Sequence, residues 1–364
     1  MRTLSASILA LLFAVAGFGI QATAQEALPA KFADDPVAKA LGPAVFNAAL
    51  KEGAVNWYGD DVANDFLAGG GKERFEKRFG IKLVDTTGRL RELTDRIRTE
   101  GSVSRRVADV FNCNDQYMLE LHALGFLEMW RPPAAELNNI AKEAFVREPA
   151  GFWWPLHLSA QSLLVNTNLV KEQDIPKSYW DILDPKWKGK VGIRDPRSAG
   201  GGGWQFLHIA QVPSLGMDYL KKFKEAVNPF IISGGGDMAR DAAVTGRFSL
   251  VFNGRGEHIR DLPKGSPVKF VVPKEGLAWT PASIAMIKGA PHPNAAKLLM
   301  TWIYEVPQIQ LWSNSGRPIP HPAVKMAVPE MSVSDYPLMD AIPSSQLADP
   351  NAFFKEMEQV FGVR

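Results

Sequence analysis

A short apolar strand that runs into a glycine-rich loop is the part of this sequence best suited to chemistry. Val191 and Ile193 give the strand its apolar face, and a turn signal ends it at Asp195. Four consecutive glycines, residues 200–203, then open the next helix. Glycine lets bare backbone approach a bound group, and the N–H donors of a helix N-terminus attract negative charge. We therefore predict that a small anion is bound by Asp195, Ser198, Gly200, Gly201 and Gly202.

A second basic candidate lies on the loop Asn253-Gly254-Arg255-Gly256. Two flanking glycines let the ligand approach Arg255 without side-chain crowding, and a planar guanidinium matches the paired oxygens of a carboxylate or phosphate. We predict that Arg255 and Asn253 contact the ligand. The alternative is that Arg255 is a surface residue that forms an ion pair with Asp261 or Glu257.

Four more candidates stand at predicted loop tips or nearby. Arg89 follows Gly88 where a strand turns into a helix, and both are predicted to contact the ligand. Tyr58 ends the first strand, where a phenol can donate a hydrogen bond, and Trp204 follows the glycines as an aromatic contact. The alternatives are a solvated helix start for Arg89, a cover over the core for Tyr58 and a flexible surface loop for the glycines.

Motifs of the common enzyme classes are missing from the sequence. There is no GxSxG, HExxH or CxxC, and the Gly-Lys pairs at 71–72 and 189–190 lack the Ser or Thr of a phosphate-binding loop. The six histidines show no metal-ligand spacing. We predict a protein without enzymatic activity, resident metal or cofactor.

Four sequence blocks resemble family 1 extracellular solute-binding proteins, the periplasmic receptors of ABC importers. They are DILDPKWKGK at 181–190, VNWYG at 55–59, ADVF at 108–111 and APHPNAA at 290–296. The resemblance covers roughly residues 54–320 and points to the branch that includes ferric-ion, phosphonate and sugar-phosphate binders. It implies a two-lobed, type II periplasmic binding protein that captures a small organic anion (carboxylate, phosphonate or phosphate ester) and delivers it to an ABC permease.

Iron-binding members of that family use an adjacent pair of tyrosines after a strand of the second lobe, because phenolates are hard ligands for a trivalent ion. None of the six tyrosines here is adjacent to another, and Arg255 stands where the pair is expected. Ferric ion with a bound anion and a polyamine-like cation remain alternatives, the latter because acidic residues also lie at loop tips. A sensory module and, remotely, a secreted hydrolase are two others.

The N-terminus predicts export. Arg2 precedes a mostly apolar run at residues 8–20, and a small-residue cleavage site ends at Ala24, so residues 1–24 are read as a signal peptide. The single cysteine, Cys113, is far from that site, so we expect a periplasmic protein without a lipid anchor. A formal net charge of +2 argues against nucleic acid as a partner, and we expect a monomer.

The organisation of the chain predicts an α/β fold with two lobes, each a mostly parallel sheet flanked by helices. Strands at 54–58, 81–85 and 108–111 alternate with helices at 71–79, 91–100 and 115–124. Long extended runs at 153–166 and 268–273 are predicted to cross between the lobes as a hinge. We assign residues 25–155 to lobe one, 156–270 to lobe two, 271–320 to the return into lobe one and 321–364 to a C-terminal helical segment.

Overall fold

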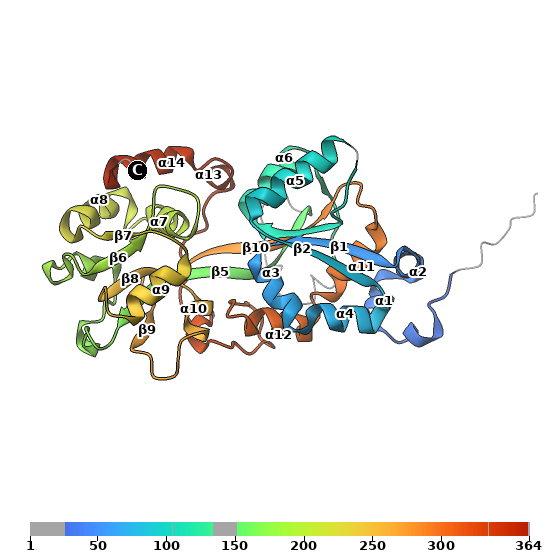
Figure 1. The fold of residues 1–364 in the computed structure, drawn as a ribbon, viewed down its shortest axis with the longest axis horizontal. Helices are drawn as coiled ribbons and strands as arrows, with labels where there is room; N and C mark the ends of the chain where they lie inside the picture. The colour runs from blue at the N-terminus through green and yellow to red at the C-terminus, as the bar shows by residue number, and fades with distance from the viewer. Residues whose placement is uncertain (1–25, 104, 134–150, 334, 363–364) are drawn as a thin grey trace, which may run out of the picture.

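The computed structural model describes residues 26–103, 105–133, 151–333 and 335–362, so the predicted signal peptide lies outside the described residues. Two lobes lie side by side, joined by the long strands β5 and β10 (Figure 1). The predicted two-lobed α/β fold is confirmed. No helix in the described ranges is long and apolar enough to cross a membrane.

Lobe one is built on three parallel strands in the order β2-β1-β3. The strands are β1 (Ala54–Gly59), β2 (Lys82–Thr87) and β3 (Val110–Asn114), and the helices are α1 (Pro36–Leu41), α2 (Pro43–Glu52), α3 (Asp61–Phe66), α4 (Lys72–Phe79), α5 (Leu90–Ser102), α6 (Asp115–Ala123), α11 (Pro293–Trp302) and α12 (Val306–Asn314). Large aromatic side chains fill the core, with Phe66 stacked on Trp312 at 4.6 Å between ring centroids. Helices α11 and α12 pack on the core of this lobe.

Lobe two repeats the arrangement with parallel strands in the order β8-β6-β7. The strands are β6 (Val191–Arg194), β7 (Phe230–Ile232) and β8 (Leu250–Gly254), and the helices are α7 (Gly201–Gln211), α8 (Gly216–Val227), α9 (Gly236–Val244) and α10 (Gly256–Arg260). The C-terminal helix α14 (Asn351–Phe361) packs Met357 and Phe361 into the core of this lobe. Figure 1 shows α14, in red, on the side of lobe two that also carries α7 and α8.

The two crossing strands are β5 (Trp153–Asn166) and β10 (Ala278–Ile287), which pair antiparallel. Because β10 also pairs with β3 and β5 with β8, one sheet continues from lobe to lobe. The prediction that residues 268–273 form the second crossing is wrong. That segment is β9 (Val268–Val271), which pairs antiparallel with the end of β5 in lobe two. An extended run in the sequence does not reveal its pairing partner, and the turn at Gly276, with φ of 105°, precedes the true crossing.

The chain passes between the lobes once more after α12. Ile319 and Val324 pack with the core of lobe one, whereas Val328 and Met331 pack with β8 and α9 side chains of lobe two. The predicted lobe boundaries at 155, 270 and 320 stay a prediction. In parallel sheets of this kind, ligands bind beyond the carboxyl ends of the strands, which here face the boundary between the lobes.

Candidate functional site

Two arginines lie close together at the carboxyl ends of neighbouring strands. Arg194 is the last residue of β6 and Arg255 directly follows β8, and the two strands are parallel partners. Burial, followed by the positive charge of Arg255, lowers the pKa of Arg194 to about 10. Neither an ion pair nor a hydrogen bond joins the Arg194 guanidinium to any described residue, and its buried Nε has no acceptor there. The strand ends of lobe two therefore carry positive charge that the described chain does not neutralise.

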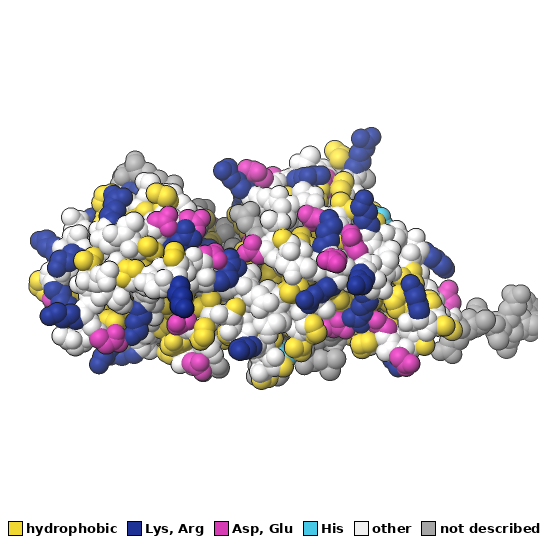
Figure 2. Space-filling view, turned by 60° about the horizontal axis from the view of Figure 1, so that its bottom comes forward, with side chains coloured by type: hydrophobic (Ala, Val, Ile, Leu, Met, Phe, Trp, Pro, Cys, Tyr) yellow, Lys and Arg dark blue, Asp and Glu magenta, His cyan; other side chains and the backbone are white. Residues whose placement is uncertain are grey.

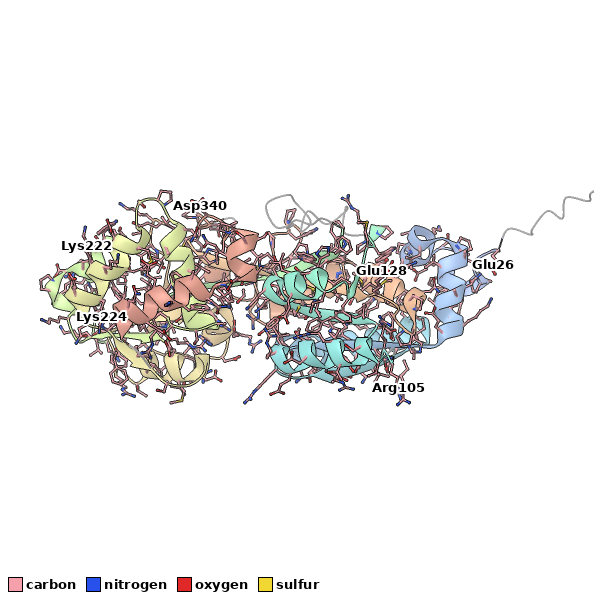
Figure 3. All side chains as sticks on the ribbon, turned by 90° about the horizontal axis from the view of Figure 1, so that it is seen from above. Glu26, Arg105, Glu128, Lys222, Lys224 and Asp340 are labelled. Carbon is pink, nitrogen blue, oxygen red and sulfur yellow. The ribbon has the colours of Figure 1, made fainter. Side chains whose placement is uncertain are left out.

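Beside Arg194 lies a cavity of about 340 Å³. The predicted site residues that line it are Asp195, Ser198, Gly200 and Gly202, and the loop after β7 completes the wall with Ser233 and Gly234. A larger groove, of about 980 Å³, adjoins it at Ser198 and Ala199. Residues of α5 and α6 in lobe one and of α14 in lobe two border this groove, and Figure 3 shows these helices facing each other across the lobe boundary. The cavity and the groove together form a cleft between the lobes.

Backbone geometry and packing within the protein itself explain why the loop contains glycines. Gly200 has φ of 141°, in the region that favours glycine. A Cβ on Gly202 would lie 2.4 Å from the carbonyl oxygen of Asp195, and one on Gly203 would lie 2.2 Å from that of Ser198. The loop must thus fold back tightly on the end of β6. No side chain caps the N-terminus of α7, so its first amides are not used by a capping residue.

Asp195 stabilises this loop as an ion-pair partner. Its Oδ1 accepts hydrogen bonds from the backbone N and the Nε of Arg197, both at 2.9 Å. Arg197 also donates to the carbonyl oxygen of Gly362 at 2.8 Å, which ties the loop to the chain after α14. Because Arg197 neutralises Asp195, the carboxylate does not cancel the charge of Arg194.

Arg255 forms an ion pair with a carboxylate that a second arginine shares, and the charge of Asp60 also acts on it. Its Nη1 is 3.5 Å from Glu257 Oε1, while Nη2 of Arg317 is 3.1 Å from the same oxygen. Burial lowers the pKa of Arg255. Burial alone would raise the pKa of Glu257, but Arg317 and then Arg255 outweigh it and hold that pKa at about 2. Glu257 is therefore an anion throughout the physiological range, and its single charge serves two guanidiniums.

Asn253 braces the loop that presents Arg255. It is fully buried with φ of 71°, and its backbone N and side-chain Nδ2 both donate to Gln205 Oε1 at 2.8 Å. Nδ2 also donates to Gln161 Oε1 at 2.9 Å. Since Gln205 belongs to α7 and Gln161 to β5, these bonds fix the position of Arg255 relative to the glycine loop and the hinge.

Neither Asn253 and Arg255 nor the remaining predicted contacts Tyr58, Gly88, Arg89 and Trp204 are among the residues that line the cavity and the groove. Tyr58 is buried beneath α5, where its hydroxyl donates to Glu100 Oε1 at 2.6 Å, and burial followed by Glu100 raises its pKa. Arg89 precedes α5 with its side chain 87% exposed and 3.5 Å from Glu92, and the backbone N of Gly88 donates to Gly59. Trp204 is buried against Leu207, Ile342 and Leu347. The positions of Tyr58 and Arg89 agree with the alternatives given above, a cover over the core and a solvated helix start. Their roles in ligand binding stay predictions.

Arg194 and Arg317 are functional candidates that sequence reasoning did not select. A signal was present for Arg194, since it ends the predicted strand at the edge of the sheet where ligands bind. Nothing local in the sequence marks Arg317, which reaches Glu257 only through the fold. In the described ranges, no group of three or more His, Cys, Asp or Glu side chains is placed to hold a metal ion.

Comparison of the sequence with models of known protein families shows to which family the chain belongs. The family model described as bacterial extracellular solute-binding protein matches residues 106–342. The chain belongs to this family. The match includes both crossing strands, the glycine loop and the loop that carries Arg255, so the cleft described above belongs to a solute-binding protein.

Curated relatives match only parts of this solute-binding protein. An uncharacterised protein of Haemophilus influenzae is 30% identical over 191 residues, which cover 49% of this chain and 53% of the relative. Iron uptake protein A1 of Synechocystis is 31% identical over 121 residues, covering 33% and 32% of the two chains. The chain thus spans about half the length, or less, of the curated relatives it matches.

Solved structures of similar fold match nearly their whole length. One is the Trichodesmium protein in complex with iron and citrate, with a TM-score of 0.67, 20% identity and coverage of 86% of this chain and 100% of that one. Another is the periplasmic binding protein AfuA of Actinobacillus pleuropneumoniae with fructose-6-phosphate, with a TM-score of 0.66, 18% identity and coverage of 85% and 99%. At such identities the likeness shows the shared two-lobed fold.

Proposed function

We propose that this solute-binding protein captures a small organic anion between its lobes and delivers it to an ABC permease in the membrane. The observation that carries the proposal is the pair of guanidiniums, Arg194 and Arg255, at the ends of β6 and β8. Arg194 has no acidic partner among the described residues, and Arg255 shares Glu257 with Arg317. A buried charge without a counter-ion is costly, and a bound carboxylate, phosphonate or phosphate ester would supply one.

The pocket beside Arg194 fits this proposal. Uncapped amides at the start of α7 and the hydroxyl of Ser198 are donors suited to anion oxygens. The adjoining groove of about 980 Å³ has room for the body of an organic ligand. Two similar structures were solved with organic anions, citrate with iron in one and fructose-6-phosphate in the other. Closure of the lobes about the ligand is the expected mechanism.

Ferric ion held together with an anion is the second candidate, because several relatives are named as iron-uptake or ferric-binding proteins. In that case the arginine pair would bind the accompanying anion. A polyamine-like cation would instead meet the repulsion of Arg194 and Arg255. We propose further that the protein works in the periplasm as a monomer and has no catalytic role, as its family consists of solute-binding proteins.

A thermal-shift screen tests the proposed function. The mature protein would be heated with citrate, inorganic phosphate, methylphosphonate, phosphate esters, spermidine and ferric citrate. An anion present at a hundred times its dissociation constant should stabilise the fold by about 2.7 kcal/mol. A double variant, Arg194→Met with Arg255→Met, should lose that shift, whereas Arg105→Met, an exposed arginine on the outer part of lobe one (Figure 3), should keep it. Stabilisation by spermidine alone would contradict the proposal.

A further inference from the structure

The short helix α10 carries a charged contact between the two lobes. Glu257, in α10 of lobe two, forms an ion pair at 3.1 Å with Arg317, which stands in the sequence between the lobe-one core residues Trp312 and Ile319. Arg260, at the end of α10, lies 3.8 Å from Asp65 of α3 in lobe one. Figure 2 shows basic and acidic side chains next to each other where the two lobes meet. These contacts hold α10 against lobe one.

Backbone packing at the same place is equally close. A Cβ on Gly256 would lie 2.0 Å from the carbonyl oxygen of Gly316, so only glycine is accommodated next to Glu257. The position of the Glu257 carboxylate is consequently fixed from both sides, by its own helix in lobe two and by Arg317 from lobe one. A carboxylate held in this way lies directly beside Arg255, one of the two guanidiniums proposed to bind the anion.

Two guanidiniums share this one carboxylate. Glu257 Oε1 is 3.1 Å from Arg317 and 3.5 Å from Arg255, and the charge of Arg255 in turn lowers the pKa of Arg194. Arg255 is the more distant of the two partners, so its ion pair with Glu257 is the one that an anionic ligand can replace. Two buried histidines nearby add no charge at neutral pH, because burial lowers the pKa of His157 to about 3 and that of His258 to about 4.

We propose that Glu257 is a built-in competitor for Arg255, which an anionic ligand displaces from the guanidinium when it binds. This inference rests on the proposed function, since it concerns the affinity of the same cleft. A ligand oxygen on Arg255 would lie within a few ångströms of the Glu257 carboxylate, and like charges at such distances repel strongly where water is excluded. Glu257 therefore lowers the affinity for anions and keeps ligand release possible, while its ion pair with Arg317 preserves the contact between the lobes.

Substitution of Glu257 tests this role. Glu257→Gln removes the charge and keeps the shape, and it should tighten the binding of citrate and inorganic phosphate about 10- to 100-fold in calorimetry at low salt. Glu257→Asp draws the carboxylate back from Arg255 and should give a smaller gain. Asp261→Asn is the matched control, because Asp261 follows the same helix but pairs with Arg260, and it should leave both affinities unchanged.

A second measurement separates competition at Arg255 from a purely structural role. Loss of the ion pair to Arg317 should lower the melting temperature of Glu257→Gln, and loosening of the cleft alone would weaken binding instead of tightening it. In an Arg255→Met background, Glu257→Gln should produce no gain, since the two residues act through one contact. A gain that persists in that background contradicts the inference.

The outcomes also distinguish this inference from the proposed function. If the wild-type protein binds citrate or phosphate and Glu257→Gln binds it equally or more weakly, the role of Glu257 is wrong while anion binding stands. If neither protein binds any anion of the panel, the proposed function and this inference both fail. Tighter binding by Glu257→Gln that requires Arg255 supports both.

Discussion

Replacing Arg194 by methionine should stabilise the fold and weaken anion binding at the same time. Methionine keeps an unbranched apolar side chain of similar reach and removes the charge. Burial and then Arg255 lower the pKa of Arg194 from the ordinary value of a guanidinium to about 10. Because the folded-state pKa is the lower one, the cost of keeping the guanidinium charged is fully present below about pH 10. The cost disappears only as the pH rises from there to the ordinary pKa of a guanidinium, so the whole penalty applies at pH 7.

The size of the effect follows from the pKa. A tenfold change in proton affinity corresponds to about 1.4 kcal/mol, which sets an upper limit of roughly 3 kcal/mol. Solvent reaches part of the Arg194 side chain and screens its charge, so we expect a gain of about 1–2 kcal/mol in the free energy of unfolding. For lobes of this size that is a rise of roughly 2–8 °C in melting temperature. Anion binding should weaken by about 2 kcal/mol or more, roughly 30-fold.

Calorimetry measures both quantities on the same samples. Differential scanning gives the melting temperature without added ligand, and titration with the best anion of the panel gives the affinity. Arg105→Met serves as the control, since its exposed side chain should change neither value. A lower melting temperature in Arg194→Met would refute the reasoning, because it would mean that Arg194 has a stabilising partner within the protein. An unchanged affinity would refute it as well, because it would mean that Arg194 does not bind the anion.

Three further predictions concern neighbouring groups. Arg255→Ala should weaken anion binding by about 2–5 kcal/mol, and Arg255→Lys should restore only part of it, because an ammonium cannot make two parallel hydrogen bonds; titration of the three proteins checks this. Gly202→Ala should lower the melting temperature by several degrees, as its Cβ would lie 2.4 Å from the Asp195 carbonyl oxygen. Tyr58→Phe should cost about 1 kcal/mol of stability through the lost bond to Glu100 and leave anion affinity unchanged, whereas reduced affinity would return Tyr58 to the site.

Much of the fold could be predicted because its elements carry strong local patterns. The strand Trp153–Asn166 was predicted with the bounds that the structure gives it, since its length and lack of helical period leave no other reading. The second crossing could not be predicted in the same way. Both β9 and β10 are extended in the sequence, and what makes β10 the crossing is its pairing with β3 in one lobe and β5 towards the other. Such pairings connect residues more than a hundred positions apart.

The candidate site shows the same division between local and distant information. The glycine loop was visible because four consecutive glycines are costly unless close approach requires them. The orientation of Tyr58 was not visible, because neighbouring strand residues point to opposite faces and the sequence does not say which face α5 covers. The ion pair between Arg317 and Glu257 joins segments about sixty residues apart, and no local sequence pattern predicts it.

Several arginines elsewhere in the protein have acidic partners, in contrast to Arg194 at the strand ends of lobe two. Arg78 is bound by Asp35 and Glu305, with Nε 2.8 Å from Asp35. Arg91 reaches Glu120 at 2.9 Å. Arg194, which burial makes more costly to charge, has no acidic partner in the described ranges. Local features that oppose stability often mark functional positions, because selection for folding alone would remove them. The missing counter-ion at Arg194 is therefore the strongest reason to expect that an anion binds there.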